Sequence, residues 1–199
     1  MAGHRALVAA GRSIVDLLNR RFAEAIPAGQ RRPAAVLAGT NDFDEVNSSA
    51  TAVIRYPAVS VYCYRISVDR ETRAGWSAVA STDGVPRIPL RMHLLFAAWD
   101  TVVESELEWL GLTAQVLESE SILTGPLLHP SGEWEPGDVL QVVPDELALD
   151  SMSEAFQALT TDYRLSLPYV ARVIRIHGRR TTAASPVATV ASSLNGVPA

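Results

Sequence analysis

The sequence has 199 residues, of which 48% are hydrophobic and 20% charged, and its formal net charge is −5. The composition is that of an ordinary globular protein, and the length suits one domain that buries roughly 70% of its unfolded surface. No apolar run approaches the roughly 20 residues that a membrane-spanning helix needs, which excludes that class of protein.

The N-terminal residues and the cysteine content both indicate a reducing compartment. The apolar piece between Arg5 and Arg12 is too short for the core of a signal peptide. Cys63 is the only cysteine, so no disulfide can form within the chain. We therefore expect the protein to be cytoplasmic.

The first predicted element is an amphipathic helix over residues 3–25. Its apolar positions recur at helical spacing, and they are Leu7, Val8, Ile14, Val15, Leu18 and Phe22. Pro27 follows the end of this helix. Residues 27–49 are rich in Pro, Gly, Asn, Asp and Ser, which predicts a long loop or a weakly structured connection.

Two strongly patterned strands are predicted in the middle of the chain. Residues 58–68 alternate cleanly, and residues 88–98 carry a continuous apolar face that begins with Ile88. Shorter strands are predicted over residues 51–56 and 76–82, with a polar turn over residues 69–75.

A second helix is predicted to begin at a capping box formed by Thr101 and Glu104. Its core stripe consists of Val103, Leu107, Leu110, Ala114 and Leu117. Gly111 lies in the middle of this helix, where it costs about 1 kcal/mol relative to alanine, so we expect it to allow a close backbone approach.

The last part of the folded region contains the strand around which the domain is organised. A turn-rich loop over residues 125–137, a short strand over 139–143 and a helix starting at Ser151 lead into residues 163–176. Read with a period of two, that segment is apolar on both faces, which predicts a central strand covered on both sides. One face would carry Leu165, Leu167, Tyr169, Ala171 and Val173, and the other Val170, Ile174 and Ile176. The predicted fold class is α/β (α+β), a single domain with a mixed sheet flanked by about three helices.

Signatures of catalysis and of metal binding are absent from the sequence. There is no phosphate-binding glycine loop, no nucleophile elbow and no pair of histidines at ligand spacing. Cys63 reads as an inert thiol, and residues 41–45 read as a solvated turn rather than a calcium loop. The arginine pairs are too sparse to predict a nucleic-acid groove. Arg91 and His93 could line a pocket, although a structural histidine is the more economical interpretation.

The charges are segregated along the chain. All 17 basic residues are arginine, and none lies between Met92 and Tyr163, where acidic residues recur. This pattern has two interpretations, a well-solvated surface or a self-complementary surface on which the acidic patch of one copy faces the basic patch of another.

Three stretches in a fixed order resemble a known family. They are Val59-Ser-Val-Tyr-Cys-Tyr-Arg65 with the turn at residues 70–74, Pro86–Trp99 with Trp109-Leu-Gly-Leu112, and Leu147–Ser151 with Tyr163–Val173. Together they are similar to tail-terminator, or cap, proteins of phage-tail-like contractile injection systems, specifically the N-terminal domain family of that cap. Two residues differ from the family motif: Cys63 stands where leucine is favoured, and Phe156 stands where tryptophan is common. Both differences keep the position apolar.

The resemblance implies a tail-terminator-like domain over residues 1–177 and a flexible C-terminal tail over residues 178–199. It implies a structural, non-enzymatic subunit that forms a sixfold ring on the baseplate-distal end of the particle, ends tube polymerisation and anchors the last sheath layer. The implied partners are copies of itself, the inner tube and the sheath, with no cofactor, metal, nucleic acid or membrane. One alternative is a small-molecule-binding or enzymatic cytoplasmic α/β domain, and another is a monomeric adaptor between other proteins.

For such a ring the sequence suggests which charges pair between neighbouring subunits. The acidic residues are Glu104, Glu108 and Glu118 on the second helix. The first choice of basic counterpart is Arg172, Arg175, Arg179 and Arg180, and the second is the first helix with Arg12 and Arg20.

Overall fold

A computed structural model describes residues 3–73, 85–146, 153, 156 and 164–178. The helices are α1 (Ala6–Ala25), α2 (Arg70–Arg73) and α3 (Val103–Ser119). The strands are β1 (Ala34–Ala38), β2 (Ala58–Val68), β3 (Arg87–Trp99), β4 (Ile122–Thr124), β5 (Val139–Pro144) and β6 (Ser166–His177). Short 3₁₀ turns lie at Thr40–Phe43, Gly125–Leu127 and Pro130–Gly132.

The six strands within the described residues form one mixed sheet in the order β1-β2-β3-β6-β5-β4. All neighbours are antiparallel except β1, which runs parallel to β2. This confirms the predicted mixed sheet and the central place of the strand near residues 163–176, because β6 lies between β3 and β5. The long strands β2 and β3 also have the positions that the alternating pattern predicts.

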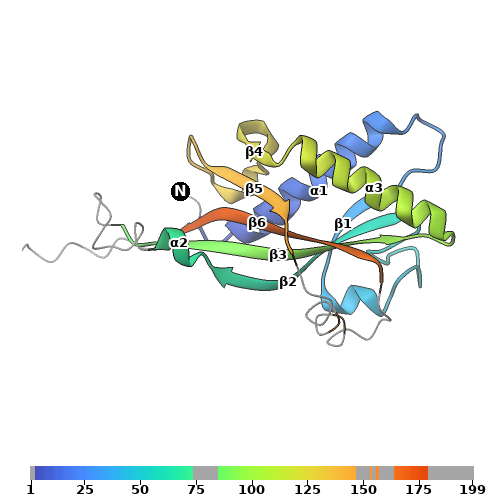
Figure 1. Cartoon of the computed structure of the whole chain (residues 1–199), viewed down its shortest axis with the longest axis horizontal. Coiled ribbons are helices and arrows are strands. Elements are labelled where there is room, and N and C mark those ends of the chain that lie inside the picture. The colour runs from blue at the N-terminus through green and yellow to red at the C-terminus, as the bar shows by residue number, and fades with distance from the viewer. Residues whose placement is uncertain (1–2, 74–84, 147–152, 154–155, 157–163, 179–199) are drawn as a thin grey trace, which may run out of the picture.

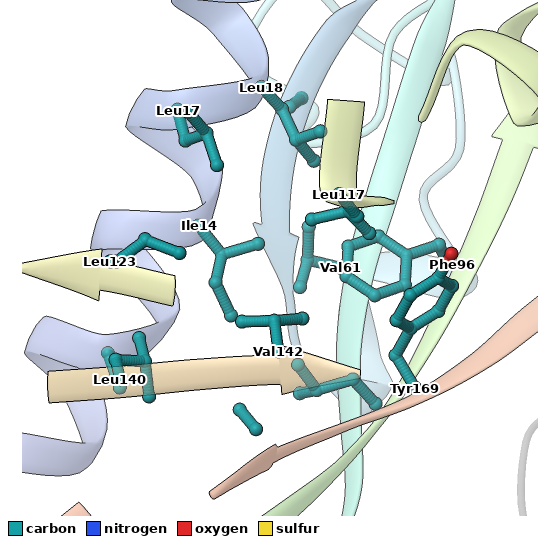
Figure 2. Packing of buried hydrophobic residues seen from close by; sticks show 14 of the residues in the cluster. Ile14, Leu17, Leu18, Val61, Phe96, Leu117, Leu123, Leu140, Val142 and Tyr169 are labelled. Atoms are coloured by element: carbon teal, nitrogen blue, oxygen red, sulfur yellow. The ribbon is translucent and has the colours of Figure 1, made fainter. Parts of the chain in front are cut away.

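The two long helices α1 and α3 lie on the same face of the sheet (Figure 1). Their buried side chains meet those of the strands in one continuous core, which Figure 2 shows from close by. Ile14, Leu17 and Phe22 of α1 and Leu117 of α3 are fully buried there. Burial of each such side chain stabilises the fold by about 1.5–3 kcal/mol relative to exposure, so this face carries most of the stability.

The alternation predicted for β6 is interrupted by a bulge. On β3 only Arg91 separates Leu90 from Met92, whereas their partners on β6 are Ile174 and Ala171. The extra residue on β6 brings Ile174 onto the same face as Ala171, and both lie in the helix-side core. The prediction that they occupy opposite faces was therefore wrong.

The segment between α1 and β2 is more ordered than predicted. Instead of a long loop it contains β1 and the 3₁₀ turn that ends at Phe43, and it covers one end of the other sheet face. Phe43 packs edge-on against Tyr62 at 5.1 Å between ring centroids and lies 5.7 Å from Trp99. The strand predicted over residues 51–56 was wrong, because those residues form turns.

The start of α3 differs from the prediction. No side chain caps the helix at Val102, so the predicted Thr101–Glu104 capping box does not form. Instead the carboxylate of Glu106 accepts a hydrogen bond from the backbone amide of Asp100 at 3.1 Å. Asp100 also accepts a hydrogen bond at 3.2 Å from the indole of Trp109.

The orientation of α3 on the sheet also differs from the prediction. Trp109, Thr113 and Val116 face the core, whereas Val103 and Leu107 are 61% and 52% exposed. The predicted stripe therefore was wrong at its first two positions. The indole bond to Asp100 turns the first half of the helix so that Trp109 is inside.

The sequence also predicted features that lie outside the described residues. These are the short strand over residues 76–82, most of the helix that starts at Ser151 and the C-terminal tail. The predicted division into residues 1–177 and 178–199 stays a prediction.

Candidate interaction surfaces

A polar chain crosses the sheet face opposite α1 and α3. The Ser67 hydroxyl lies 2.9 Å from Nε2 of His93, and Nδ1 of His93 lies 3.0 Å from a carboxylate oxygen of Asp145. Hydroxyl, imidazole and carboxylate in this order have the hydrogen-bond geometry of a nucleophile activated by a base. This was not predicted from the sequence, because the three residues are far apart along the chain.

The surroundings of Ser67 do not favour catalysis. Acyl transfer needs hydrogen-bond donors aimed at the oxyanion, and the nucleophile is commonly presented on a sharp turn. Ser67 instead lies within β2, opposite Arg91 of β3. Two residues further along, the Asp69 amide donates to the Pro89 carbonyl. Because hydrogen-bonded pairs recur at every second residue of an antiparallel ladder, Ser67 and Arg91 also form such a pair. Its own amide is thus used by the sheet. The bond from His93 to Asp145 passes over β6 and ties β3 to the end of β5.

Arg91 has a structural role. Its guanidinium donates to the buried carboxylate of Asp69 at 2.8 Å and to Glu71 at 3.2 Å, which fixes α2 against β3. These carboxylates neutralise Arg91, so its charge serves to hold the elements together. The pocket that Arg91 and His93 could line stays a prediction.

The described ranges offer neither a metal site nor a membrane-spanning helix. Over residues 3–73, 85–146 and 164–178, no three His, Cys, Asp or Glu side chains are grouped closely enough to hold a metal ion. None of the helices in these ranges has the length and apolar character to cross a bilayer. Burial raises the pKa of the Cys63 thiol, so little of the reactive thiolate forms near neutral pH.

The acidic residues predicted for an interface lie on the outer side of α3. Glu104, Glu108 and Glu118 are all exposed. Glu118 is ten residues beyond Glu108, which separates the two by about 15 Å along the helix axis. Glu104 and Glu108 therefore form one acidic site at the start of α3, and Glu118 is a separate one.

The predicted basic counterparts are largely occupied within the chain. Arg175 donates to the buried carboxylate of Asp138 at 2.7 Å, and Arg172 donates to the side-chain oxygen of Gln141 at 2.9 Å. Arg179 and Arg180 lie outside the described residues. By contrast, Arg5 at the N-cap of α1 and Arg12 and Arg20 within α1 are exposed.

Two exposed apolar surfaces accompany these charges, and sequence reasoning missed both. One is the stripe of Val103 and Leu107 on α3, between the exposed glutamates. The other is a groove of about 490 Å³ between the start of α1 and strands β1 and β2. Exposed apolar patches on a small domain usually mark contacts with other proteins.

Comparison with known proteins identifies the family. The sequence matches the Pvc16 N-terminal domain family over residues 9–189. The chain belongs to this family.

Solved structures are similar to this Pvc16-family domain. One is the sheath/tube terminator of PVC, an extracellular contractile injection system, in its extended state, with a TM-score of 0.55 and 18% sequence identity. That match covers 94% of this chain and 64% of that chain. Another is the tube-terminating cap of the anti-feeding prophage, with a TM-score of 0.47, 15% identity, and 90% of this chain and 59% of that chain covered. The present chain thus spans less than two thirds of both, and no curated protein sequence matches it.

Proposed function

We propose that this protein is the terminator, or cap, subunit of a contractile injection system. In this role it forms a ring on the baseplate-distal end of the inner tube, ends tube polymerisation and anchors the last layer of sheath. The observation that carries the proposal is membership of the Pvc16 N-terminal domain family over residues 9–189. The shared fold with a sheath/tube terminator, aligned over 94% of the chain, supports it.

The distribution of side chains supports a structural role. The polar groups that are most enclosed, such as Asp69, Asp100 and Asp138, are bound to arginines and backbone amides that hold elements together. The exposed groups instead form an acidic apolar stripe and an open apolar groove. Surfaces of this kind suit contacts with other subunits better than they suit a small substrate.

The proposed partners are other copies of the chain, the tube protein and the sheath protein. In a closed ring each subunit presents one face to the next copy's other face, so the interface joins two different surfaces of the same chain. The particle is assembled in the cytoplasm in this proposal, and the domain works without a cofactor.

Deletion of the gene in a strain that produces the particles tests the proposal. Without a terminator, tube growth has no defined end, so electron micrographs should show tubes of widely varying length and sheaths that detach from the distal end. Supplying the intact chain from a plasmid should restore a narrow length distribution. Particles of normal, uniform length in the deletion strain would contradict the proposal.

A further inference from the structure

The groove between α1 and β2 exists because β1 ends early. β1 pairs with residues 58–62 of β2 and ends at Ala38, so residues 63–68 of β2 extend past it. The groove is lined by Leu7 and Val8 of α1, Leu37 of β1, and Tyr62 and Ile66 of β2, among others. Val8 and Ile66 are each 50% exposed, so the lining is apolar and open to solvent.

The first half of α3 carries an exposed apolar stripe, which is a ridge rather than a groove. Val103, Leu107 and Gly111 follow one another at intervals of four residues, which places them on one stripe of the helix. Among the described residues, a Cβ atom at Gly111 would meet nothing within 4 Å. The predicted close backbone approach at Gly111 is therefore not made by the described part of the chain, and the stripe is narrow and apolar.

The charges around the two surfaces are complementary. Arg5 and Arg12 lie one turn before and one turn after Val8, and no acidic residue precedes Asp16 in the sequence. Glu104 and Glu108 flank Leu107 on α3, and no arginine occurs between Met92 and Tyr163. The α1 side of the groove thus carries Arg5 and Arg12, and the stripe on α3 is flanked by Glu104 and Glu108.

The two surfaces cannot meet within one molecule. α1 starts toward the end of the domain near the marked N-terminus, whereas α3 starts at the opposite end (Figure 1). Their C-terminal halves approach each other, where Arg21 forms an ion pair with Glu120. Unlike surfaces at opposite ends of one subunit are what a head-to-tail ring requires.

We propose that the first half of α3 of one copy docks into the α1–β2 groove of the next copy. Val103 and Leu107 enter the groove beside Val8 and Ile66, and Glu104 and Glu108 face Arg5 and Arg12. This inference rests on the proposed ring and names the contact that builds it. It places the basic half of the interface on α1 rather than at Arg172 and Arg175, because those two side chains are bound to Gln141 and Asp138.

Disulfide trapping in assembled particles tests the contact directly. The native thiol is first removed with Cys63→Ala, and the chain then receives Val8→Cys and Leu107→Cys. A disulfide requires the two Cβ atoms to lie about 3.5–4.5 Å apart, so it forms only if the two positions meet. We expect mild oxidation of purified particles to give a ladder of covalent multimers that collapses on reduction.

The matched control replaces Val8→Cys with Ile122→Cys and keeps Leu107→Cys. Ile122 is 54% exposed on β4 and lies outside the groove, so this chain should not form the ladder. The inference is overturned if the Val8/Leu107 pair forms no ladder in particles that contain the protein and are of normal length; the proposed function would survive that result. The inference is also overturned if a thiol-reactive cross-linker joins the Leu107→Cys chain to the tube or sheath protein. That result would show that another protein covers the stripe.

Charge reversal provides a second test that leaves the apolar positions untouched. Glu104→Arg with Glu108→Arg, or Arg5→Glu with Arg12→Glu, should each lower the amount of protein incorporated into particles. Combining all four changes should restore incorporation. If the quadruple variant shows no restoration, or if Arg172→Glu rescues the α3 variant instead, the pairing with α1 is wrong. Tubes of normal length from a strain without the protein would refute the proposed function itself.

Discussion

At the scale of single residues, Asp100 is the junction between the sheet and α3. Its carboxylate is almost fully enclosed, accepts hydrogen bonds from the Trp109 indole and from the backbone and hydroxyl of Thr101, and lies 2.7 Å from the guanidinium of Arg31. Burial alone would raise the pKa of Asp100, but the Trp109 and Thr101 hydrogen bonds and the Arg31 charge lower it below its usual value of 3.8. The folded state therefore favours the ionised carboxylate.

Asp100→Asn tests this network. A carboxyl group with a depressed pKa contributes stability that is present above the unfolded pKa of 3.8 and is lost as the pH falls through the lower folded pKa. We expect the substitution to lower the free energy of unfolding near pH 7 by about 1–3 kcal/mol, because it removes a charged partner from Arg31 and weakens the acceptor for Trp109. Below pH 3.8 the difference between variant and wild type should shrink, as measured by urea unfolding at several pH values.

Ser67 provides a prediction about catalysis. Because its amide is used in the β2–β3 ladder, the Ser67–His93–Asp145 chain should hold strands together without activating the hydroxyl. A fluorophosphonate that labels activated serines should leave Ser67 unmodified, and Ser67→Ala should leave particle length unchanged. Stoichiometric labelling that is lost in Ser67→Ala would instead support the enzymatic alternative.

At the scale of elements, a substitution of Gly111 in α3 should affect the stability of the monomer and its incorporation into particles in opposite directions. Glycine within a helix costs about 1 kcal/mol relative to alanine, and nothing in the described chain occupies the space beside Gly111. Gly111→Ala should therefore raise the free energy of unfolding of the monomer by up to about 1 kcal/mol. It should also reduce incorporation into particles, because a methyl group would keep the neighbouring subunit away from the helix.

The matched control for this substitution is Gln115→Ala, one turn further along α3 and also exposed. It should change stability little, because both residues favour helices, and it should leave incorporation unchanged. Equal incorporation of Gly111→Ala and wild type would show that no backbone approaches this glycine.

Elements with strong periodicity could be predicted from the sequence, and weakly patterned ones could not. β2 and β3 alternate over long stretches, and α1 keeps its helical spacing, so all three were placed correctly. β1 and β4 were missed because they are short edge strands without alternation, and β1 is Ala-rich. The register of β6 was misread because a bulge adds one residue, which the pattern of one strand cannot reveal.

The interaction surfaces were predicted only in part. The exposed positions of Glu104 and Glu108 follow from helical spacing, but the exposure of Val103 and Leu107 depends on the Trp109–Asp100 bond, which involves a residue outside the helix. The internal partner of Arg175 lies on a distant loop next to β5. Both contacts involve a residue outside the element that carries the predicted side chain, so the pattern of that element alone does not reveal them.

At the scale of the whole molecule, the proposed ring should be sensitive to salt. Each exposed ion pair contributes only about 0.2–1 kcal/mol, and salt screens it over a Debye length of about 10 Å at 0.1 M. Self-association of the purified protein, followed by mass photometry, should therefore weaken gradually as salt rises but not vanish, because the apolar stripe and groove contribute independently of charge. Association that is indifferent to salt would show that the charge segregation is only a solvated surface.

The most direct test of the central claim is to see where the protein lies in an intact particle. Cryo-electron microscopy of purified particles, with focused classification on both ends, would resolve the position of the domain. The terminator role predicts a closed ring of six copies on the tube end distal to the baseplate, in contact with the last tube and sheath layers. Absence of this domain from that end, or its location elsewhere in the particle, would contradict the account.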